Sequence, residues 1–228
     1  MKKGITKLVT MAVLAAVLAG GVLTGCNDTA KTKTSTTDSV SSTVSTAESP
    51  KTDQYDPAEL DENTTYFVDI DIKDEGKIII RLDQKAAPLT CANFVALANM
   101  GFYDGLTFHR IMEGFMMQGG DPEGTGNGGS ENTIKGEFSA NGVENPLSHT
   151  RGAVSMARNP VSMDSASSQF FIVQKDSLFL DGSYACFGYV TDGMDVVDKI
   201  CTEAEPTDDN GTIEKDKQPI INSVRVRT

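Results

Sequence analysis

The chain has 228 residues, of which 39% are hydrophobic, and it carries a formal net charge of −12 at pH 7. This length accommodates one full-sized domain with extensions. The acidic balance disfavours nucleic-acid binding and polybasic attachment to anionic lipid, because both need clustered positive charge. No two of the four cysteines have the close C-x-x-C spacing of a structural zinc site. We therefore expect no metal and no cofactor.

The N-terminus has the pattern of a targeting segment. Three lysines lie within the first seven residues, and a nearly continuous apolar run follows from residue 8 to residue 23. This run is shorter than the roughly 20 residues that a membrane-spanning helix needs. It ends in Leu-Thr-Gly-Cys, which resembles the bacterial lipobox. That resemblance predicts a lipoprotein signal peptide over residues 1–25 and lipidation, including palmitate, at Cys26; an ordinary secretory signal with an incidental cysteine is the alternative.

A polar segment separates this N-terminus from the first strand-like pattern. Residues 26–63 are rich in Ser, Thr, Lys, Asp and Glu, and such a composition cannot bury enough apolar surface to fold. We expect a lipidated cysteine followed by a disordered tether. A flexible coil of about 35 residues spans roughly 33 Å. The predicted location is the extracytoplasmic side of the cell membrane, attached through the lipid anchor alone.

The folded domain is expected over residues 64–228. Residues 66–72 alternate apolar and acidic side chains in their second half, and residues 77–82 follow after a short turn, which together predict a β-hairpin. Pro88 is suited to the first position of a helix, because its missing N–H has no helical partner there. A helical apolar spacing continues from it until Gly101, a residue typical of helix C-termini.

The rest of the domain contains short strand-like runs and one more helix. The strands are expected at residues 106–111, 115–118, 152–157, 169–173, 186–190 and 220–226, and the helix at residues 194–201. Many short strands with Gly-rich turns and two distant helices predict a barrel or a sandwich. Periodicity alone does not separate these two architectures.

The sequence supports neither a dinucleotide-binding motif nor a serine-hydrolase motif, and its isolated histidine and cysteines are expected to have no catalytic role. Residues 124–129 fit G-x-G-x-x-G, but no convincing helix follows, so we expect a surface loop rather than a dinucleotide site. No G-x-S-x-G motif is present, and His149 is expected to be a solvated loop histidine. Cys91 and Cys186 lie in apolar stretches and are expected in the core.

Three longer stretches are more specific. Residues 108–121 read FHRIMEGFMMQGGD, residues 155–172 contain SMAR and SSQFFI, and residues 179–188 read FLDGSYACFG. In this order they resemble the motifs of the cyclophilin family, and the likeness extends from about residue 65 to residue 227. The resemblance implies a mainly β fold, an eight-stranded antiparallel barrel capped by two α-helices. It also implies peptidyl-prolyl cis-trans isomerase activity in a groove on the outer face.

The resemblance implies a role for each residue that matches the family motifs. Arg110 would be catalytic, supported by Phe115 in the proline pocket and by Gln118, which would bond the substrate backbone. The substrate-binding residues would be Met116, Ala157, Arg158, Phe171, Phe179, Leu180, Tyr184 and Gly126. The last of these would border a second, shallower pocket.

Three positions depart from the usual family pattern. Phe179 and Tyr184 replace a tryptophan and a histidine, and Arg158 stands where asparagine is common. We predict a monomeric isomerase that acts on proline-containing polypeptides without binding nucleic acid. The alternative is a non-catalytic prolyl-peptide-binding or chaperone module on the cell surface. A structural surface lipoprotein is a more distant third interpretation.

Overall fold

The computed structural model describes residues 60–228; the predicted signal peptide, Cys26 and the tether up to residue 59 lie outside the described residues. The described part contains two α-helices, α1 (Pro88–Asn99) and α2 (Met194–Glu203). Its strands are β1 (Phe67–Ile72), β2 (Gly76–Leu82), β3 (Thr107–Met112), β4 (Met116–Asp121), β5 (Ala153–Met156), β6 (Phe170–Val173), β7 (Cys186–Asp192) and β8 (Ile221–Arg227). Over this range, no helix combines the length and apolar character needed to cross a membrane.

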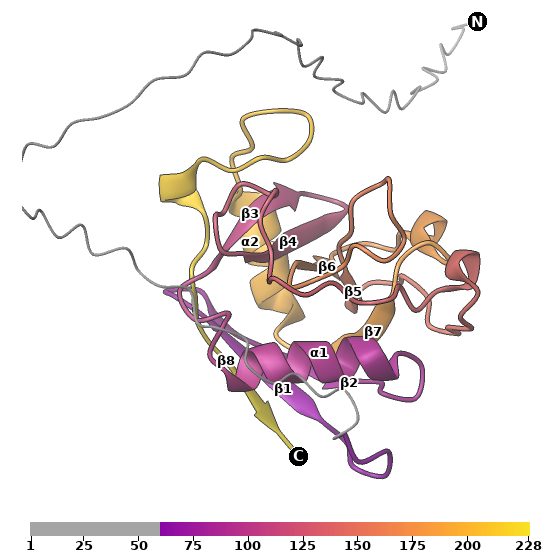
Figure 1. Cartoon of the computed structure of the whole chain (residues 1–228). Helices are drawn as coiled ribbons and strands as arrows, with labels where there is room; N and C mark the ends of the chain where they lie inside the picture. The colour runs from indigo at the N-terminus through magenta and orange to yellow at the C-terminus, as the bar shows by residue number, and fades with distance from the viewer. Residues whose placement is uncertain (1–59) are drawn as a thin grey trace, which may run out of the picture. The chain divides into compact units, whose positions relative to one another are not determined.

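All eight strands belong to one antiparallel sheet with the order β3-β4-β6-β5-β7-β2-β1-β8. The sheet curls until its two edge strands approach each other (Figure 1). Thr107 and Ile220 form an isolated bridge there, and the Phe108 N–H donates to the Pro219 carbonyl at 3.0 Å. The architecture is thus a curled half-barrel with two helices. The predicted fold class is confirmed, and each predicted strand and helix is present within a few residues of its expected bounds.

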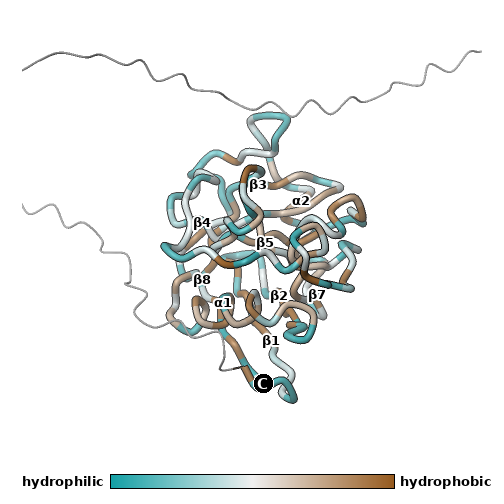
Figure 2. The backbone as a smooth tube through the Cα atoms, turned by 45° about the vertical axis from the view of Figure 1, so that its right-hand side comes forward, coloured by the Kyte–Doolittle hydropathy of each residue, from teal (hydrophilic) through white to brown (hydrophobic). Residues whose placement is uncertain are grey.

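The inner face of the sheet forms the main core. In β1, Val68, Ile70 and Ile72 are buried, whereas the intervening acidic residues point outward. This alternation follows from the pleat of a strand, which sends successive side chains to opposite faces. Figure 2 shows hydrophobic segments along the strands and α1, while many of the connecting loops are hydrophilic.

Helix α1 is fixed by contacts that are distant in sequence. Pro88 occupies its first turn, and the buried carboxylate of Glu137 accepts hydrogen bonds from the backbone N–H groups of Leu89 and Thr90. A carboxylate at this end satisfies free N–H groups and complements the helix dipole. Phe94 then packs with ring centroids 4.9 to 5.2 Å from Tyr103, Phe170 and Phe187. Gly101 ends the segment with a φ of 71°.

The three described cysteines are buried and free. Burial raises the pKa of Cys186 to about 11 and that of Cys201 to about 12, and it raises the pKa of Cys91 as well. The thiols are therefore protonated at neutral pH. The interpretation of Cys91 and Cys186 as core residues is confirmed.

Candidate active site

The candidate site lies on the outer face of the half-barrel, where a second apolar cluster covers β4, β5 and β6. Alternation along the strands separates neighbours: Met117 and Phe170 point into the main core, while Met116 and Phe171 point into the outer cluster. A cavity of about 130 Å³ opens in this cluster. Nine residues line it: Arg110, Phe115, Met116, Gln118, Ala157, Arg158, Phe171, Leu180 and Tyr184. All nine were predicted from the sequence for catalysis or substrate binding.

Arg110 supplies a positive charge at the edge of this cavity. Its Nε donates to the carbonyl of Asn210 at 2.7 Å, and its Nη1 donates to Oε1 of Gln118 at 3.2 Å. The guanidinium carbon lies 5.9 Å from the ring centre of Phe115. Burial lowers the pKa of Arg110 from its very high ordinary value, but an arginine in a protein still carries its proton. These two bonds therefore hold a permanent cation in place.

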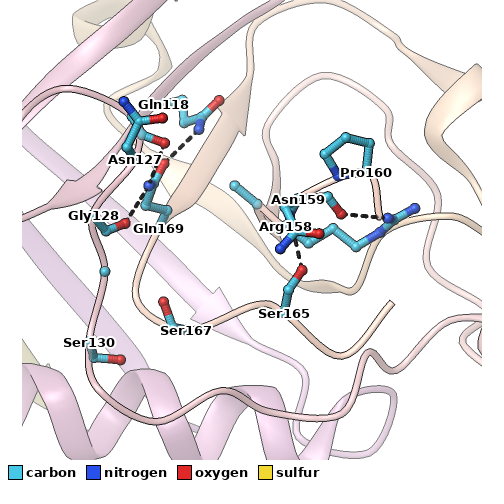
Figure 3. Close-up of a pocket in the computed structure, with 13 residues that line it drawn as sticks. Gln118, Asn127, Gly128, Ser130, Arg158, Asn159, Pro160, Ser165, Ser167 and Gln169 are labelled. Carbon is cyan, nitrogen blue, oxygen red and sulfur yellow. Dashed lines mark hydrogen bonds between the residues drawn. The ribbon is translucent and has the colours of Figure 1, made fainter. Parts of the chain in front are cut away.

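Gln118 connects this cavity to a second one. Its Nε2 donates to Oε1 of Gln169 at 2.8 Å, and Nε2 of Gln169 donates to the carbonyls of Gly126 and Gly128 at 3.1 and 2.7 Å. The second cavity, of about 450 Å³, is lined by Gly126 as predicted, and it shares Gln118, Ala157 and Arg158 with the first. Figure 3 shows Gln118 and Gln169 on one side of it and Arg158 on the other. The two cavities form one continuous groove.

The glycine-rich loop beside the second cavity is held by Asp121. This buried carboxylate accepts hydrogen bonds from the backbone N–H groups of Glu123, Thr125 and Gly126 at 2.8, 3.0 and 2.6 Å. Gly126 has a φ of 86°, and a Cβ there would lie 3.4 Å from Nε2 of His109. The loop thus adopts a compact arrangement that a glycine at this position allows.

His149 is not a solvated loop residue, so that expectation was wrong. Its ring is buried and lies between Asp181 and Ser155, with Nδ1 2.8 Å from Oδ1 and Nε2 3.0 Å from Oγ. This hydrogen-bonded Ser–His–Asp arrangement resembles the catalytic triad of serine hydrolases. However, Ser155 is fully buried and lines neither cavity of the groove. The arrangement supports the floor of the groove, because the His149 ring stacks on Phe171 at 6.1 Å.

The three departures from the family pattern occupy different places. Tyr184 lines the smaller cavity, and its ring packs edge-on against Phe171. Arg158 lines both cavities. Phe179 lines neither: its side chain is 70% exposed, and its ring lies 5.6 Å from that of Phe115. Phe179 therefore stands at the rim, next in sequence to the lining residue Leu180.

Sequence reasoning missed several residues that line the larger cavity, and it missed two residues, Gln169 and Asn210, that bond to Gln118 and Arg110. Gln169 lies inside the SSQFFI motif, and that motif was the signal that could have drawn attention to it. Asn210 contributes only its backbone carbonyl to Arg110. A main-chain contact across 100 residues leaves no trace in the side-chain pattern.

Comparison with known proteins decides the family. A family model described as "Cyclophilin type peptidyl-prolyl cis-trans isomerase/CLD" matches residues 67–226, essentially the whole described domain. The chain belongs to the cyclophilin-type peptidyl-prolyl cis-trans isomerase family. By this membership, and by the curated names and solved structures of its relatives, it is a peptidyl-prolyl isomerase.

Relatives of this cyclophilin cover most of its folded domain. It is 48% identical over 132 residues to peptidyl-prolyl cis-trans isomerase B of Bacillus subtilis, covering 58% of this chain and 86% of the relative. An isomerase of Helicobacter pylori strain J99 is 45% identical over 128 residues, with 55% and 75% covered. A crystal structure of a Cryptosporidium parvum cyclophilin superposes with a TM-score of 0.64 at 28% identity, covering 72% of this chain and 99% of that one. A second structure of the same protein was solved in the presence of the dipeptide Ala-Pro.

Proposed function

We propose that this cyclophilin accelerates rotation of X–Pro bonds in unfolded or secreted polypeptides outside the membrane, with Arg110 as the catalytic hydrogen-bond donor. The observation that carries this mechanism is that Arg110 lines the same small cavity as a cluster of large apolar side chains. Phe115, Met116, Phe171 and Leu180 offer that cavity the apolar contacts that a proline ring needs.

The chemistry requires no bond to break. The barrier to rotation is the loss of amide resonance, about 18–20 kcal/mol, and uncatalysed exchange takes tens to hundreds of seconds. When the bond twists, the proline nitrogen becomes pyramidal and regains a lone pair. A donor placed beside that nitrogen, or beside the rotating carbonyl, favours the twisted state over the planar one.

Arg110 meets these demands without a change of protonation. Its bonds to Asn210 and Gln118 fix the orientation of the guanidinium, so little reorganisation is needed when the substrate twists. Apolar neighbours exclude water, which strengthens a hydrogen bond from a cation. Gln118, in this mechanism, keeps its bonds to Arg110 and Gln169 and uses the second N–H of its Nε2 to hold the substrate backbone across the cavity.

Two further observations support a polypeptide substrate. The Ala-Pro dipeptide was present with the related Cryptosporidium parvum cyclophilin, in keeping with proline-containing peptides as substrates here. Large apolar side chains are also exposed next in sequence to lining residues: Val161, 94% exposed, follows Pro160, and Phe179, 70% exposed, precedes Leu180. Such side chains suit contact with unfolded chains, and they favour a holding, chaperone-like function as the second candidate.

The predicted location rests on the N-terminal sequence. The lipobox-like pattern at Cys26 would place an acylated cysteine at the membrane, and the polar segment after it would let a monomeric domain reach its clients. Proline isomerisation limits the folding of many chains. A foldase outside the membrane would act on polypeptides as they emerge.

An isomerisation assay on a short prolyl peptide tests the mechanism. Arg110→Ala should lower kcat/KM by about 10²- to 10³-fold, because one preorganised donor to a transition state is worth about 2.7–4 kcal/mol. Arg81→Ala removes an exposed arginine that lines neither cavity of the groove, and it should change kcat/KM little. Full turnover by a folded Arg110→Ala variant would refute the mechanism. Binding of the peptide by the native chain without turnover would instead favour the holding function.

A further inference from the structure

The groove differs in charge from the rest of the molecule. The chain has 32 acidic against 20 basic residues, yet no Asp or Glu lines either cavity. The charged lining residues are two arginines, Arg110 and Arg158. A positively charged groove in a negatively charged protein favours ligands that carry negative charge.

The proposed mechanism assigns a role to Arg110 but none to Arg158. Arg158 lines both the smaller cavity and the larger one, and Figure 3 shows it at the larger cavity. The nearby arginine, Arg110, is engaged with Gln118 and Asn210. Within residues 60–228, Arg158 forms no ion pair, whereas Arg151, Arg225 and Arg227 are each paired with an aspartate.

The guanidinium of Arg158 is held in a defined orientation. Its Nε donates to the carbonyl of Ser183 and its Nη1 to the carbonyl of Asn159, both at 3.0 Å. Its central carbon lies 4.8 Å from the ring centre of Tyr184 and 5.3 Å from that of Phe138. Nη2 forms no hydrogen bond with any other described residue. A side chain fixed in this way loses little entropy when it binds a ligand.

The loop that follows Arg158 provides no ion-pair partner for it among the described residues. Asp164 lies on the loop that follows Arg158, but its Oδ1 accepts from the backbone N–H of Gly136 at 3.0 Å and from Nδ2 of Asn141 at 2.7 Å. Asp164 lines neither cavity. Arg158 therefore lines the groove with a free Nη2 and with no carboxylate partner among the described residues.

We propose that Arg158 makes the enzyme select prolyl substrates that carry an Asp or Glu within three residues of the proline. An extended peptide advances about 3.3–3.6 Å per residue, so a chain whose proline fills the smaller cavity places such a neighbour in the larger one. A guanidinium binds a carboxylate through charge-assisted, two-pronged hydrogen bonds. This inference rests on the proposed isomerase function and adds the substrate class.

Matched peptides test the selectivity. One X–Pro peptide series would carry Glu, Gln or Lys, in turn, at each of the three positions on either side of the bond, and kcat/KM would be measured with the full chain. At one position or more, Glu should exceed Gln by about 2- to 5-fold and Lys should fall below Gln, a range typical of partly exposed ion pairs. The Glu-to-Gln ratio should shrink as salt rises from about 0.05 M to 0.5 M, because salt screens charges.

Variants assign the effect to Arg158. In R158Q the Glu-to-Gln ratio should fall to about one, whatever the change in turnover of the neutral peptide, because each ratio is taken within one protein. R158K retains the positive charge but lacks the two-pronged hydrogen bonding of a guanidinium, so it should retain part of the Glu-to-Gln ratio. R81Q removes an exposed arginine that lines neither cavity and should retain all of it.

The outcomes separate the two proposals. Equal turnover of Glu and Gln peptides at all positions, or an unchanged ratio in R158Q, overturns the selectivity while leaving the isomerase function intact. A uniform loss over all peptides in both R158Q and R158K, with an unchanged ratio, assigns Arg158 to holding Tyr184 and also overturns it. If no peptide turns over, the proposed function fails, and equilibrium binding of the same peptides then decides the selectivity by the same ratio.

Discussion

Nδ1 of His149 lies 2.8 Å from Oδ1 of Asp181, directly behind the floor of the proline pocket. Burial opposes the charge of Asp181, but hydrogen bonds from Ser148 and from His149 outweigh it and lower the pKa of this carboxyl. The carboxylate therefore accepts the Nδ1 proton, and Nε2 accepts from the hydroxyl of Ser155 at 3.0 Å. Burial also lowers the pKa of His149 against the pull of Asp181. The ring is neutral, and its tautomer is set by its two partners.

The first prediction follows from the two buried histidines. Burial lowers the pKa of His109 as it does that of His149. Below about pH 6.5 the histidines of the unfolded chain take up protons that those of the folded chain do not. The neutral histidines therefore contribute their full stabilisation above that pH, and the free energy of unfolding decreases as the pH falls below it. Each unit of pKa shift is worth about 1.4 kcal/mol. Urea unfolding at several pH values between 8 and 5.5 measures this loss.

A variant assigns the pH effect to the histidines. In His109→Gln/His149→Gln the slope of unfolding free energy against pH should flatten between pH 7 and pH 5.5, although the double variant starts from a lower stability. The exposed carboxylates titrate mainly below this window. A native protein whose stability stays constant or rises on acidification would contradict the neutral, buried state of these rings.

The second prediction concerns the anchor of the glycine-rich loop. Asp121→Ala removes the acceptor of three backbone N–H groups, which should destabilise the fold by about 2–3 kcal/mol and raise KM for prolyl peptides. KM should rise because Gln169 bonds to the carbonyls of this loop and thereby shapes the larger cavity. Urea unfolding and peptide kinetics measure the two effects. Thr125→Ala keeps the Asp121 carboxylate and its backbone bonds, and it loses only the longer hydroxyl contacts with Asp121, Glu123 and the Asn127 N–H at 3.2 to 3.4 Å, so it serves as the control; equal behaviour of the two variants would rule out the anchor.

The strand pattern could be predicted where one face of a strand is polar. In β1 the acidic residues Asp69 and Asp71 mark the outer face, so both the strand and its inward side chains could be read from the sequence. In β6 all four residues are buried, because the outer face carries the site cluster. The sequence could locate that strand, but only the motif resemblance suggested that Phe171 faces the groove.

Polar contacts over long sequence distances could not be predicted. Glu137 lies 47 residues from Thr90, and Asp181 lies 32 residues from His149. Each residue is an ordinary polar side chain in a loop pattern until the fold brings it to its partner. His149 was expected to be solvated because loops are usually exposed. Its burial depends on two partners, Asp181 and Ser155, that no local pattern reveals.

The third prediction tests the membrane anchor. Cys26→Ser removes the thiol that the lipobox-like sequence offers for acylation, so the chain should be left as uncut precursor or released from the membrane. Labelling cells with a fatty-acid probe measures the modification, and fractionation measures the release. Cys201→Ser removes a buried thiol and should keep the label. Label that persists on the Cys26→Ser chain would exclude the predicted lipidation site.

The last prediction concerns cyclosporin, a cyclic peptide that occupies the groove of family members. There, the tryptophan at the position of Phe179 offers an indole N–H to the drug, whereas phenylalanine has no donor. One lost hydrogen bond, with a drug carbonyl left partly unpaired, should weaken inhibition by about 1–3 kcal/mol, or roughly 5- to 150-fold. Turnover should suffer much less, because the proline pocket is formed by other residues.

Phe179 is well placed for a substitution that restores the donor. It stands at the rim with its side chain 70% exposed, so a larger indole fits without displacing the core. Phe179→Trp should therefore tighten inhibition by several-fold or more while changing kcat/KM for a short peptide little. Leu178→Trp adds an indole one residue away, at a side chain that is 55% exposed and lines neither cavity, and it should not tighten inhibition. Inhibition of the native enzyme at low nanomolar drug, or equal effects of the two tryptophans, would mean that the residue at position 179 does not meet the drug.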